Sequence, residues 1–173
     1  MSRGLGDVYK RQSLNSDDIQ TITTEWKGIQ TWDCENPNLY TLKLELLNPQ
    51  KQIVHIHEER IGFRTIEFRP KDGIYVNGTK IIVKGTNRHS FHPDGGRTTN
   101  RELSLQDALL IKEMNMNAVR SHYPPDKHFL EICDSLGIFY LNELAGWQNS
   151  YDTETGLKLL SEMINRDVNH PCI

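Results

Sequence analysis

The sequence predicts a chain built of two kinds of structure, a β-rich part followed by an α/β part, with a boundary near residue 70. Up to that point apolar and polar residues alternate with a period of two, and after Gly85 strand-like segments alternate with helical ones. With 36% hydrophobic and 25% charged residues, the composition is that of a globular segment. No apolar run approaches the length of about 20 residues that a membrane helix needs.

The first residues predict a segment that is foreign to the fold. Asp7 to Gln12 have the sequence DVYKRQ, which is typical of a translated adapter from sequencing-library preparation. We therefore expect residues 1–12 to be a non-native leader, and exclude them from fold reasoning. An ordinary polar leader is the alternative. Since a true N-terminus is then missing, the sequence leaves open whether the protein is cytoplasmic, periplasmic or secreted.

Residues 13–70 predict antiparallel β-structure. Tyr40, Leu42, Leu44 and Leu46 alternate with more polar residues, as expected of a half-buried strand. Further strands are predicted at residues 52–57 and 61–68. Turn-forming residues such as Asn48-Pro49 separate these runs, which favours the strands of a β-sandwich.

A hairpin is predicted directly after the boundary, within the second part (residues 71–173). Asn77-Gly78 separates the apolar runs 74–76 and 80–83. This dipeptide is a strong hairpin signal because both residues tolerate positive φ in a type I′ turn.

Strands and helices then alternate along the chain. Ser104 is a plausible N-cap for the helix that carries Leu105 to Met114, and Gly137 closes a second helix in the αL conformation. The predicted elements in order are strand 117–120, helix 127–136, strand 138–141, helix 155–168 and the opening of a fourth strand at 172–173. This succession predicts a parallel sheet with right-handed crossovers. A whole (β/α)8 barrel needs about 250 residues, so we expect only the first three βα units of an incomplete barrel.

Unusual polar residues follow each predicted barrel strand. They lie in the segments 85–90, 120–125 and 142–148. In barrels and open parallel sheets, function gathers at the carboxyl ends of the strands. The sequence therefore places its candidate site in these three loops.

The same segments carry a family resemblance. Gly85-Thr86-Asn87-Arg88-His89, Asn117-Ala118-Val119-Arg120 before Ser121-His122-Tyr123-Pro124, Asn142-Glu143 and Arg166 to Pro171 resemble consecutive signatures of glycoside hydrolase family 2, of the β-galactosidase type. Trp32, Asn36 to Tyr40 and Ile61-Gly62-Phe63-Arg64 resemble strands of that family's immunoglobulin-like domain. The resemblance implies the C-terminal part of an immunoglobulin-like β-sandwich at 13–70 and the N-terminal part of a TIM-barrel glycosidase domain at 71–173.

The activity implied by this resemblance is retaining exo-hydrolysis of terminal β-linked sugars, with a β-galactoside or a related carbohydrate as the partner. Two carboxyl groups about 5 to 5.5 Å apart carry that mechanism. The family's acid/base Glu follows shortly after a segment like Asn169-His170-Pro171 and its nucleophile comes later, so both are expected beyond Ile173 and this chain is expected to be inactive by itself. A β-glucuronidase fragment and a non-catalytic carbohydrate-binding module are the alternatives.

The resemblance also implies roles for single residues. His89 and His122 would hydrogen-bond sugar hydroxyls, Arg120 would keep the nucleophile ionised, and Trp147 would offer an apolar platform to a sugar ring. Glu143 would contact sugar hydroxyls or pair with a cation. Structural alternatives remain for each: Arg120 could satisfy backbone carbonyls, Trp147 could belong to the core, and a lone histidine at a strand end is more often structural.

Departures from the family pattern lie in the same loops. One residue fewer separates Arg120 from the Ser-His-Tyr-Pro segment, which would turn the strand end near His122, while Asn142 and Cys172 replace a more usual Asp and Ser. The loop at 146–149 has neither the Glu nor the His that bind magnesium in the best-known β-galactosidases, so neither a metal nor another cofactor is predicted.

The charge and the cysteine content of the chain indicate which kinds of binding partner to expect. A net charge of -3 and a pI of about 6.2 predict neither a nucleic-acid nor a membrane partner. The three cysteines lack ligand spacing and are expected to be free thiols. A homo-oligomeric parent protein is left open.

Overall fold

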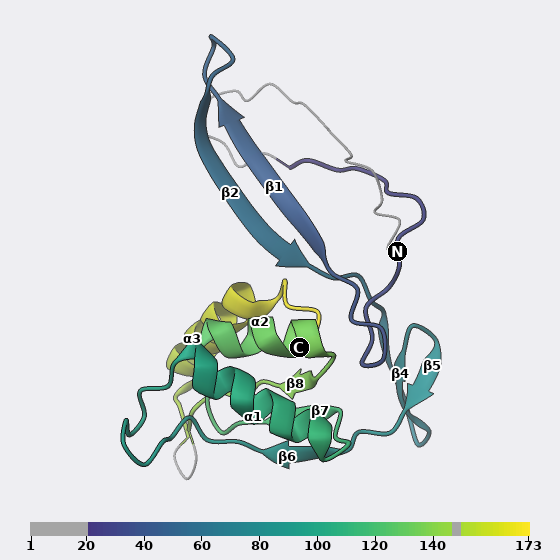
Figure 1. Ribbon diagram of the computed structural model, residues 1–173, viewed down its shortest axis with the longest axis vertical. Coiled ribbons are helices and arrows are strands. Elements are labelled where there is room, and N and C mark those ends of the chain that lie inside the picture. The colour runs from purple at the N-terminus through teal and green to yellow at the C-terminus, as the bar shows by residue number, and fades with distance from the viewer. Residues whose placement is uncertain (1–20, 147–149) are drawn as a thin grey trace. The chain divides into compact units, whose positions relative to one another are not determined.

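The computed structural model describes residues 21–146 and 150–173, and its chain divides into two units, residues 1–30 and 31–173 (Figure 1). The predicted leader at 1–12 lies outside the described residues. Residues 21–30 carry neither helix nor strand, and all the regular elements that the structure describes belong to the second unit. No helix in the described part of the chain is both long enough and apolar enough to cross a membrane.

A long antiparallel hairpin opens the second unit. It consists of β1 (Tyr40–Leu47) and β2 (Ile53–Ile61), paired so that Tyr40 lies opposite Ile61. The turn is closed by Asn48, whose side-chain oxygen accepts the Gln52 amide at 2.8 Å. Side chains along a strand point alternately to its two faces, so Leu42, Leu44 and Leu46 of β1 all project to one side of the hairpin. The predicted strands are confirmed here.

A second antiparallel sheet follows, in the order β3 (Ile66–Arg69), β4 (Gly73–Val76) and β5 (Thr79–Ile81). Asn77 and Gly78 have φ values of 51° and 77°, which confirms the predicted hairpin turn. The predicted boundary near residue 70 falls in the turn between the paired strands β3 and β4 and stays a prediction.

One predicted strand is interrupted. Residues 61–68 were expected to be continuous, but β2 ends at Ile61 and β3 begins at Ile66. Between them the carbonyl of Phe63 accepts the amide of Trp32 at 2.8 Å, and Gly62 packs directly against Pro171. These tertiary contacts take the backbone out of strand pairing, so the prediction of one continuous strand is wrong.

Three parallel strands form the α/β part, in the order β6 (Gly85–Asn87), β7 (Ala118–Arg120) and β8 (Phe139–Leu141). Each is followed by a helix: α1 (Arg101–Glu113), α2 (Lys127–Leu136) and α3 (Thr153–Asp167). Figure 1 shows α1 and α2 side by side next to these strands. The segment 85–90 was expected to follow the first parallel strand, but its first three residues are themselves that strand, β6.

Helix ends agree with the sequence at one of two predicted caps. Gly137 ends α2 with φ 68° and ψ 48°, as predicted. Ser104, however, is not the N-cap of α1; Asn100 is, with its side chain accepting the amide of Leu103. The helix therefore begins one turn before its apolar periodicity becomes visible. The α3 helix likewise begins at Thr153, two residues before the prediction.

The segment 172–173 was expected to open a fourth strand, and the structure assigns no strand there. One bond of the expected kind is present, because the Tyr140 amide donates to the Cys172 carbonyl at 2.7 Å. A ladder needs more than this single bond, so the prediction of a strand is wrong for the residues described.

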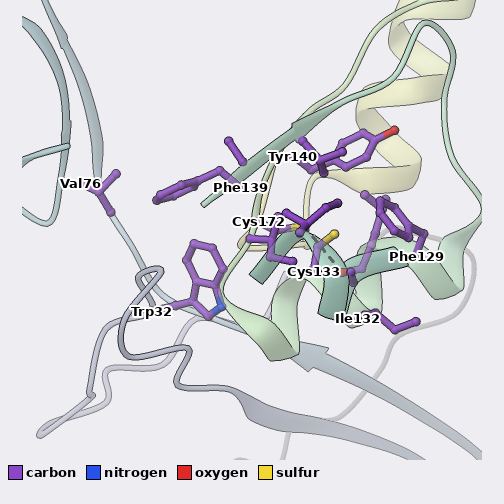
Figure 2. Close-up of a cluster of buried hydrophobic side chains, with 14 residues drawn as sticks. Trp32, Val76, Phe129, Ile132, Cys133, Phe139, Tyr140 and Cys172 are labelled. Carbon is purple, nitrogen blue, oxygen red and sulfur yellow. Dashed lines mark hydrogen bonds between the residues drawn. The ribbon is translucent and has the colours of Figure 1, made fainter. Parts of the chain in front are cut away.

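The core joins the β-rich part to the α/β part. The indole of Trp32, fully buried, meets the ring of Phe139 edge to face at 5.4 Å (Figure 2). Phe129 of α2 packs similarly on Tyr140 of β8, at 5.9 Å. Cys133 and Cys172 lie buried in the same cluster, and all three cysteines are free, as predicted.

Candidate functional site

The register of the parallel strands brings their last residues into one row. Asn87 lies beside Arg120, and Arg120 lies beside Leu141. The segments that follow these residues hold the polar side chains of the candidate site. We call this region the carboxyl edge, defined as residues 87–90, 120–123 and 141–143. It is where parallel sheets present functional groups.

An ion pair spans the carboxyl edge. The Arg120 guanidinium lies 2.5 Å from a carboxylate oxygen of Glu143, and it donates a weaker hydrogen bond of 3.5 Å to the Asn87 side-chain oxygen. The two charged side chains are 40% and 34% exposed, so solvent screens their attraction and the pair contributes little stability. Its main effect is to orient the Arg120 guanidinium of β7 between Asn87 of β6 and Glu143 of the loop after β8.

Two imidazole rings lie stacked at the same edge. His89 and His122 have ring centroids 4.7 Å apart and an angle of 9° between their planes. The Tyr123 hydroxyl lies 3.4 Å from Nδ1 of His89 and accepts the Ser90 amide at 3.0 Å. Nδ1 of His122 is buried and has no hydrogen-bond partner among the described residues. Because each imidazole offers a donor and an acceptor, the stack can bind hydroxyl groups.

A buried arginine supports this stack from behind. Arg88 lies between Asn87 and His89 in the chain, and side chains of extended backbone point alternately to opposite faces. Only 8% of Arg88 is exposed. Its Nε donates to Asp107 of α1 at 2.8 Å, and its guanidinium lies 4.0 Å from the centroid of the Phe129 ring of α2. Arg88 thus ties the loop after β6 to two helices, and so fixes the backbone that carries His89.

Tyr140 of β8 packs under the segment that follows β7. Its hydroxyl is in hydrogen-bond contact with the hydroxyl of Ser121, which also donates to the Tyr123 carbonyl at 2.5 Å. Burial raises the pKa of Tyr140 above its ordinary value, and the bond to Ser121 opposes that rise without cancelling it. The phenol therefore stays protonated and holds the backbone around His122.

The loop after β8 is held by the end of α3. The Asn142 amide donates to Asp167 at 2.7 Å, and the Asn142 oxygen accepts the backbone amide of Glu143 at 3.1 Å. Asp167 is 2% exposed and also pairs with Arg166 at 2.6 Å. The backbone of Glu143 is thereby fixed, while its carboxylate is directed to Arg120.

The structure gathers four of the five predicted site residues at the carboxyl edge: His89, Arg120, His122 and Glu143. Trp147, the fifth, lies outside the described residues. Although one residue fewer follows Arg120 than in the family pattern, His122 still stacks on His89. Their roles toward a substrate stay predictions.

Tyr123 is a site residue that the sequence did not single out. Its hydroxyl contacts both neighbouring groups on the β6 side, His89 and Ser90. The available signal was its place directly after His122 at a strand end. Metal binding has no comparable support, since within the described ranges no three His, Cys, Asp or Glu side chains are grouped to hold an ion.

Family models match both parts of the chain. The model described as "Glycosyl hydrolases family 2, TIM barrel domain" matches residues 67–173, and the model described as "Glycosyl hydrolases family 2" matches residues 6–64. With the structural matches, they support the predicted fold class, an immunoglobulin-like part followed by a TIM-barrel part. How much of the barrel this chain holds stays a prediction.

Curated relatives include a β-galactosidase of Thermoanaerobacterium thermosulfurigenes, 41% identical over 152 residues, which cover 85% of this chain and 21% of that protein. A putative β-glucuronidase of Formosa agariphila is 37% identical over 152 residues, covering 85% of this chain and 18% of its own length. The chain thus spans about a fifth of the length of these relatives.

Solved structures show the same kinship. A β-glucuronidase of Parabacteroides merdae matches with a TM-score of 0.74 and 31% identity over 83% of this chain and 18% of that one. A β-glycosidase of Bacteroides vulgatus matches with a TM-score of 0.74 and 33% identity, over 83% and 20% of the two chains. Because the barrel model alone covers more than half of the sequence, the chain belongs to glycosyl hydrolases family 2.

Proposed function

We propose that this chain supplies a substrate-facing part of the active site of a retaining exo-glycosidase that hydrolyses terminal β-linked sugars, in the manner of a β-galactosidase. The observation that carries the proposal is the convergence of the His89–His122 stack and the Arg120–Glu143 pair at one edge of three parallel strands. In this proposal residues 71–173 provide the first three βα units of the barrel, and residues 13–70 the end of an immunoglobulin-like domain.

Each side chain has a proposed task. The nitrogens of His89 and His122 bind sugar hydroxyls, and the ring of Trp147 packs against a sugar face. Arg120 presents a positive charge that lowers the pKa of a neighbouring nucleophilic carboxyl group. Glu143 holds Arg120 in place through the ion pair of 2.5 Å. These four tasks concern binding, orientation and the ionisation of the nucleophile, and none of them breaks the glycosidic bond.

The chemistry itself needs two carboxyl groups. A retaining glycosidase places them about 5 to 5.5 Å apart, one as acid/base and one as nucleophile. Among the described residues of the carboxyl edge, Glu143 is the only acidic one, and Arg120 engages its carboxylate. The 173-residue chain is therefore expected to bind sugars without hydrolysing them, and the two reacting carboxyl groups are expected in the sequence that follows a segment like Asn169-His170-Pro171.

A β-glucuronidase is the second candidate. It is favoured by the 37% identity to the putative β-glucuronidase of Formosa agariphila and by the TM-score of 0.74 to the Parabacteroides merdae β-glucuronidase. A glucuronide differs from a galactoside in the configuration of its C4 hydroxyl and in carrying a carboxylate at C6, which must be met by a cation. Arg88 and Arg120 are both already engaged by carboxylates, whereas Arg97, whose guanidinium lies 5.4 Å from the centroid of the Tyr123 ring, is a cation near the carboxyl edge that a glucuronidase could use.

The deciding experiment is to extend the source DNA in both directions, express the whole open reading frame, and assay 4-nitrophenyl β-D-galactoside and β-D-glucuronide. We expect hydrolysis of the galactoside. Preference for the glucuronide would establish the second candidate instead. A stop codon directly after Ile173, with sugar binding and no hydrolysis, would contradict the enzyme and leave a carbohydrate-binding module.

Arg120→Ala in the extended protein tests the proposed site. Loss of its charge is expected to lower kcat/KM about 100-fold, as for other groups that stabilise charge in an active site. Arg69→Ala is the matched control, because the side chains that Arg69 contacts among the described residues, Glu67 and Tyr75, belong to its own sheet. Equal activity of the two variants would exclude a site role for Arg120.

A further inference from the structure

In the segment that follows α3, residues 169–173, the middle residues 170–172 are buried although the segment has no helix or strand. Cys172 is fully buried and His170 is 6% exposed. Irregular backbone in the interior must find hydrogen-bond partners away from water. The partners of this segment come from α2, from β8, from β2 and from the stretch between β2 and β3.

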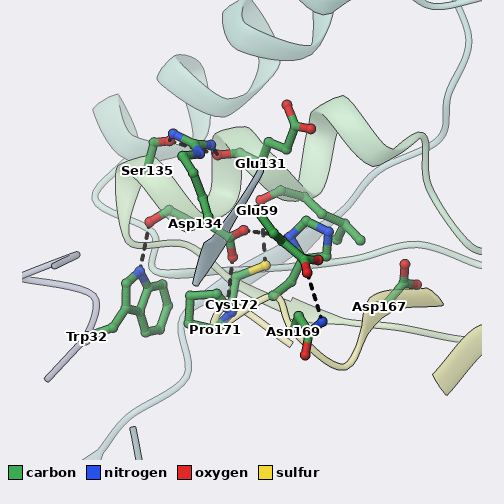
Figure 3. A network of polar contacts seen from close by, with 12 residues as sticks. Trp32, Glu59, Glu131, Asp134, Ser135, Asp167, Asn169, Pro171 and Cys172 are labelled. Carbon is green, nitrogen blue, oxygen red and sulfur yellow. Dashed lines mark hydrogen bonds and ion pairs between the residues drawn. The ribbon is translucent and has the colours of Figure 1, made fainter. Parts of the chain in front are cut away.

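Asp134 of α2 is the centre of these contacts. Its side chain is 1% exposed, and one carboxylate oxygen lies 2.6 Å from Nδ1 of His170, while the other accepts the backbone amide of Cys172 at 3.0 Å (Figure 3). Its backbone carbonyl accepts the indole N–H of Trp32 at 2.7 Å. A buried carboxylate is costly unless both oxygens are bonded, and here both bonds reach the same short segment.

The β-rich part holds the other side of the segment. The Arg64 guanidinium donates to the carbonyls of Pro171 and Ile173, and burial lowers the pKa of Arg64 from its ordinary value. Asn169 donates to Glu59 of β2 at 3.1 Å. At Gly62 the approach is so close that an added Cβ would lie 2.7 Å from Cγ of Pro171.

These contacts align the segment with β8. Consecutive amides of β8 donate in opposite directions: Phe139 donates to Asn117 next to β7 at 2.8 Å, and Tyr140 donates to Cys172 at 2.7 Å. A strand in the interior of a sheet has this pattern, with one partner on each side. The Cys172 peptide therefore occupies the place of a neighbouring strand, on the side of β8 away from β7.

We propose that His170 is a positioning residue, which acts through Asp134 to hold the Cys172 peptide beside Tyr140 and so sets the register in which the next strand joins β8. The catalytic consequence rests on the proposed function, in which that strand leads to a reacting carboxyl group. The placement of the Cys172 peptide beside Tyr140 does not depend on the proposed function. A register error of one residue would turn every following side chain to the opposite face.

Amide hydrogen exchange of the ¹⁵N-labelled 173-residue chain tests the placement. His170→Leu removes the bond to Asp134, and the Tyr140 amide is expected to exchange at least about tenfold faster, whereas the Phe139 amide keeps its rate. His170→Asn is expected to restore the slow rate, because its side-chain amide N–H can replace Nδ1 as the donor. His55→Leu is the control, since His55 is exposed and lies opposite Leu46 in the first hairpin, away from the residues that hold this segment.

Two results would overturn the proposal. An unchanged Tyr140 rate in His170→Leu would show that the peptide is held without His170. Equal acceleration of Phe139 and Tyr140 would show a general loss of stability. If His170→Leu fails to fold, Gly62→Ala provides a second test, because it displaces Pro171 without contacting Asp134. The proposal then requires that the Tyr140 amide exchanges faster while the Phe139 amide keeps its rate. Since exchange requires no activity, an extended protein that hydrolyses neither sugar would refute the proposed function and leave this result intact.

Discussion

Two polar side chains near the start of α1, Asn100 and Ser104, have opposite surroundings. Asn100 precedes the helix with extended backbone, and its side-chain oxygen accepts the Leu103 amide at 2.9 Å. Ser104 lies one turn inside the helix, fully buried, and its hydroxyl has no partner among the described residues. The first side chain satisfies a helix-end donor, and the second leaves a polar atom unsatisfied.

Asn100→Ala is therefore expected to lower the free energy of unfolding by about 1 kcal/mol, the usual cost of losing an N-cap. Ser104→Ala is expected to leave it unchanged or to raise it by less than about 1 kcal/mol, because an unpaired buried hydroxyl is removed. Urea unfolding of both variants measures the difference. If Ser104→Ala lowered the free energy of unfolding more than Asn100→Ala does, the buried hydroxyl would have a hydrogen-bond partner.

The site shows which residues a sequence can identify. His89, Arg120, His122 and Glu143 follow predicted strands, and parallel strands bring their carboxyl ends together, so their gathering could be expected. The pair of Asp134 and His170 could not, because the two residues are 36 positions apart and meet only when α2 packs against the segment after α3.

At the scale of elements, the turn between α2 and β8 depends on a glycine for two separate reasons. Gly137 has a positive φ of 68°, and a Cβ there would lie 2.4 Å from the Cys34 carbonyl oxygen. Gly96 has a similar φ of 58° with no atom within 4 Å of an added Cβ. The two glycines share the backbone conformation and differ in the space around them.

Gly137→Ala is expected to lower the free energy of unfolding by about 3 kcal/mol, since a steric clash adds to the backbone strain. Gly96→Ala is expected to cost only about 1 kcal/mol, the strain alone. Equal losses in urea unfolding would mean that the Cys34 segment moves aside freely, and that Gly137 is needed only for its φ.

Elements were predictable where their pattern was long. The strands of the first hairpin and the helix α2 show clear periodicity, and the structure confirms them. Strand β6 was missed because it is three residues long, and of its residues only Thr86 favours strands, whereas Gly and Asn are depleted in them. Its strand conformation comes from pairing with β7, which a sequence does not display.

At the scale of the whole molecule, one core serves both parts of the second unit. Trp32 lies among residues of α2 and β8, and Cys133 and Cys172 lie in the same buried cluster. A change in this cluster therefore affects the stability of residues 31–173 together. Thiol ionisation is such a change, since it would place a charge where no water reaches.

Burial raises the pKa of both Cys133 and Cys172 above the ordinary thiol value, and nearby Asp134 adds to the effect. In the unfolded chain these thiols ionise at about pH 8.5, whereas in the folded chain they stay protonated. The folded state then binds more protons than the unfolded one, so the stabilisation is complete below about pH 8.5 and decreases as the pH rises further, by up to about 1.4 kcal/mol per pH unit for each thiol.

Urea unfolding between pH 8 and pH 10, with a reductant present, is expected to show this loss. Cys172→Ser removes one of the two buried thiols and should make the decline with pH clearly shallower. Cys34→Ser is the matched control: its thiol is only partly buried, so its pKa is raised less by burial and its removal should change the slope less. Parallel declines for the parent chain and Cys172→Ser would mean that the Cys172 thiol ionises in the folded state, and that water reaches the segment that follows α3.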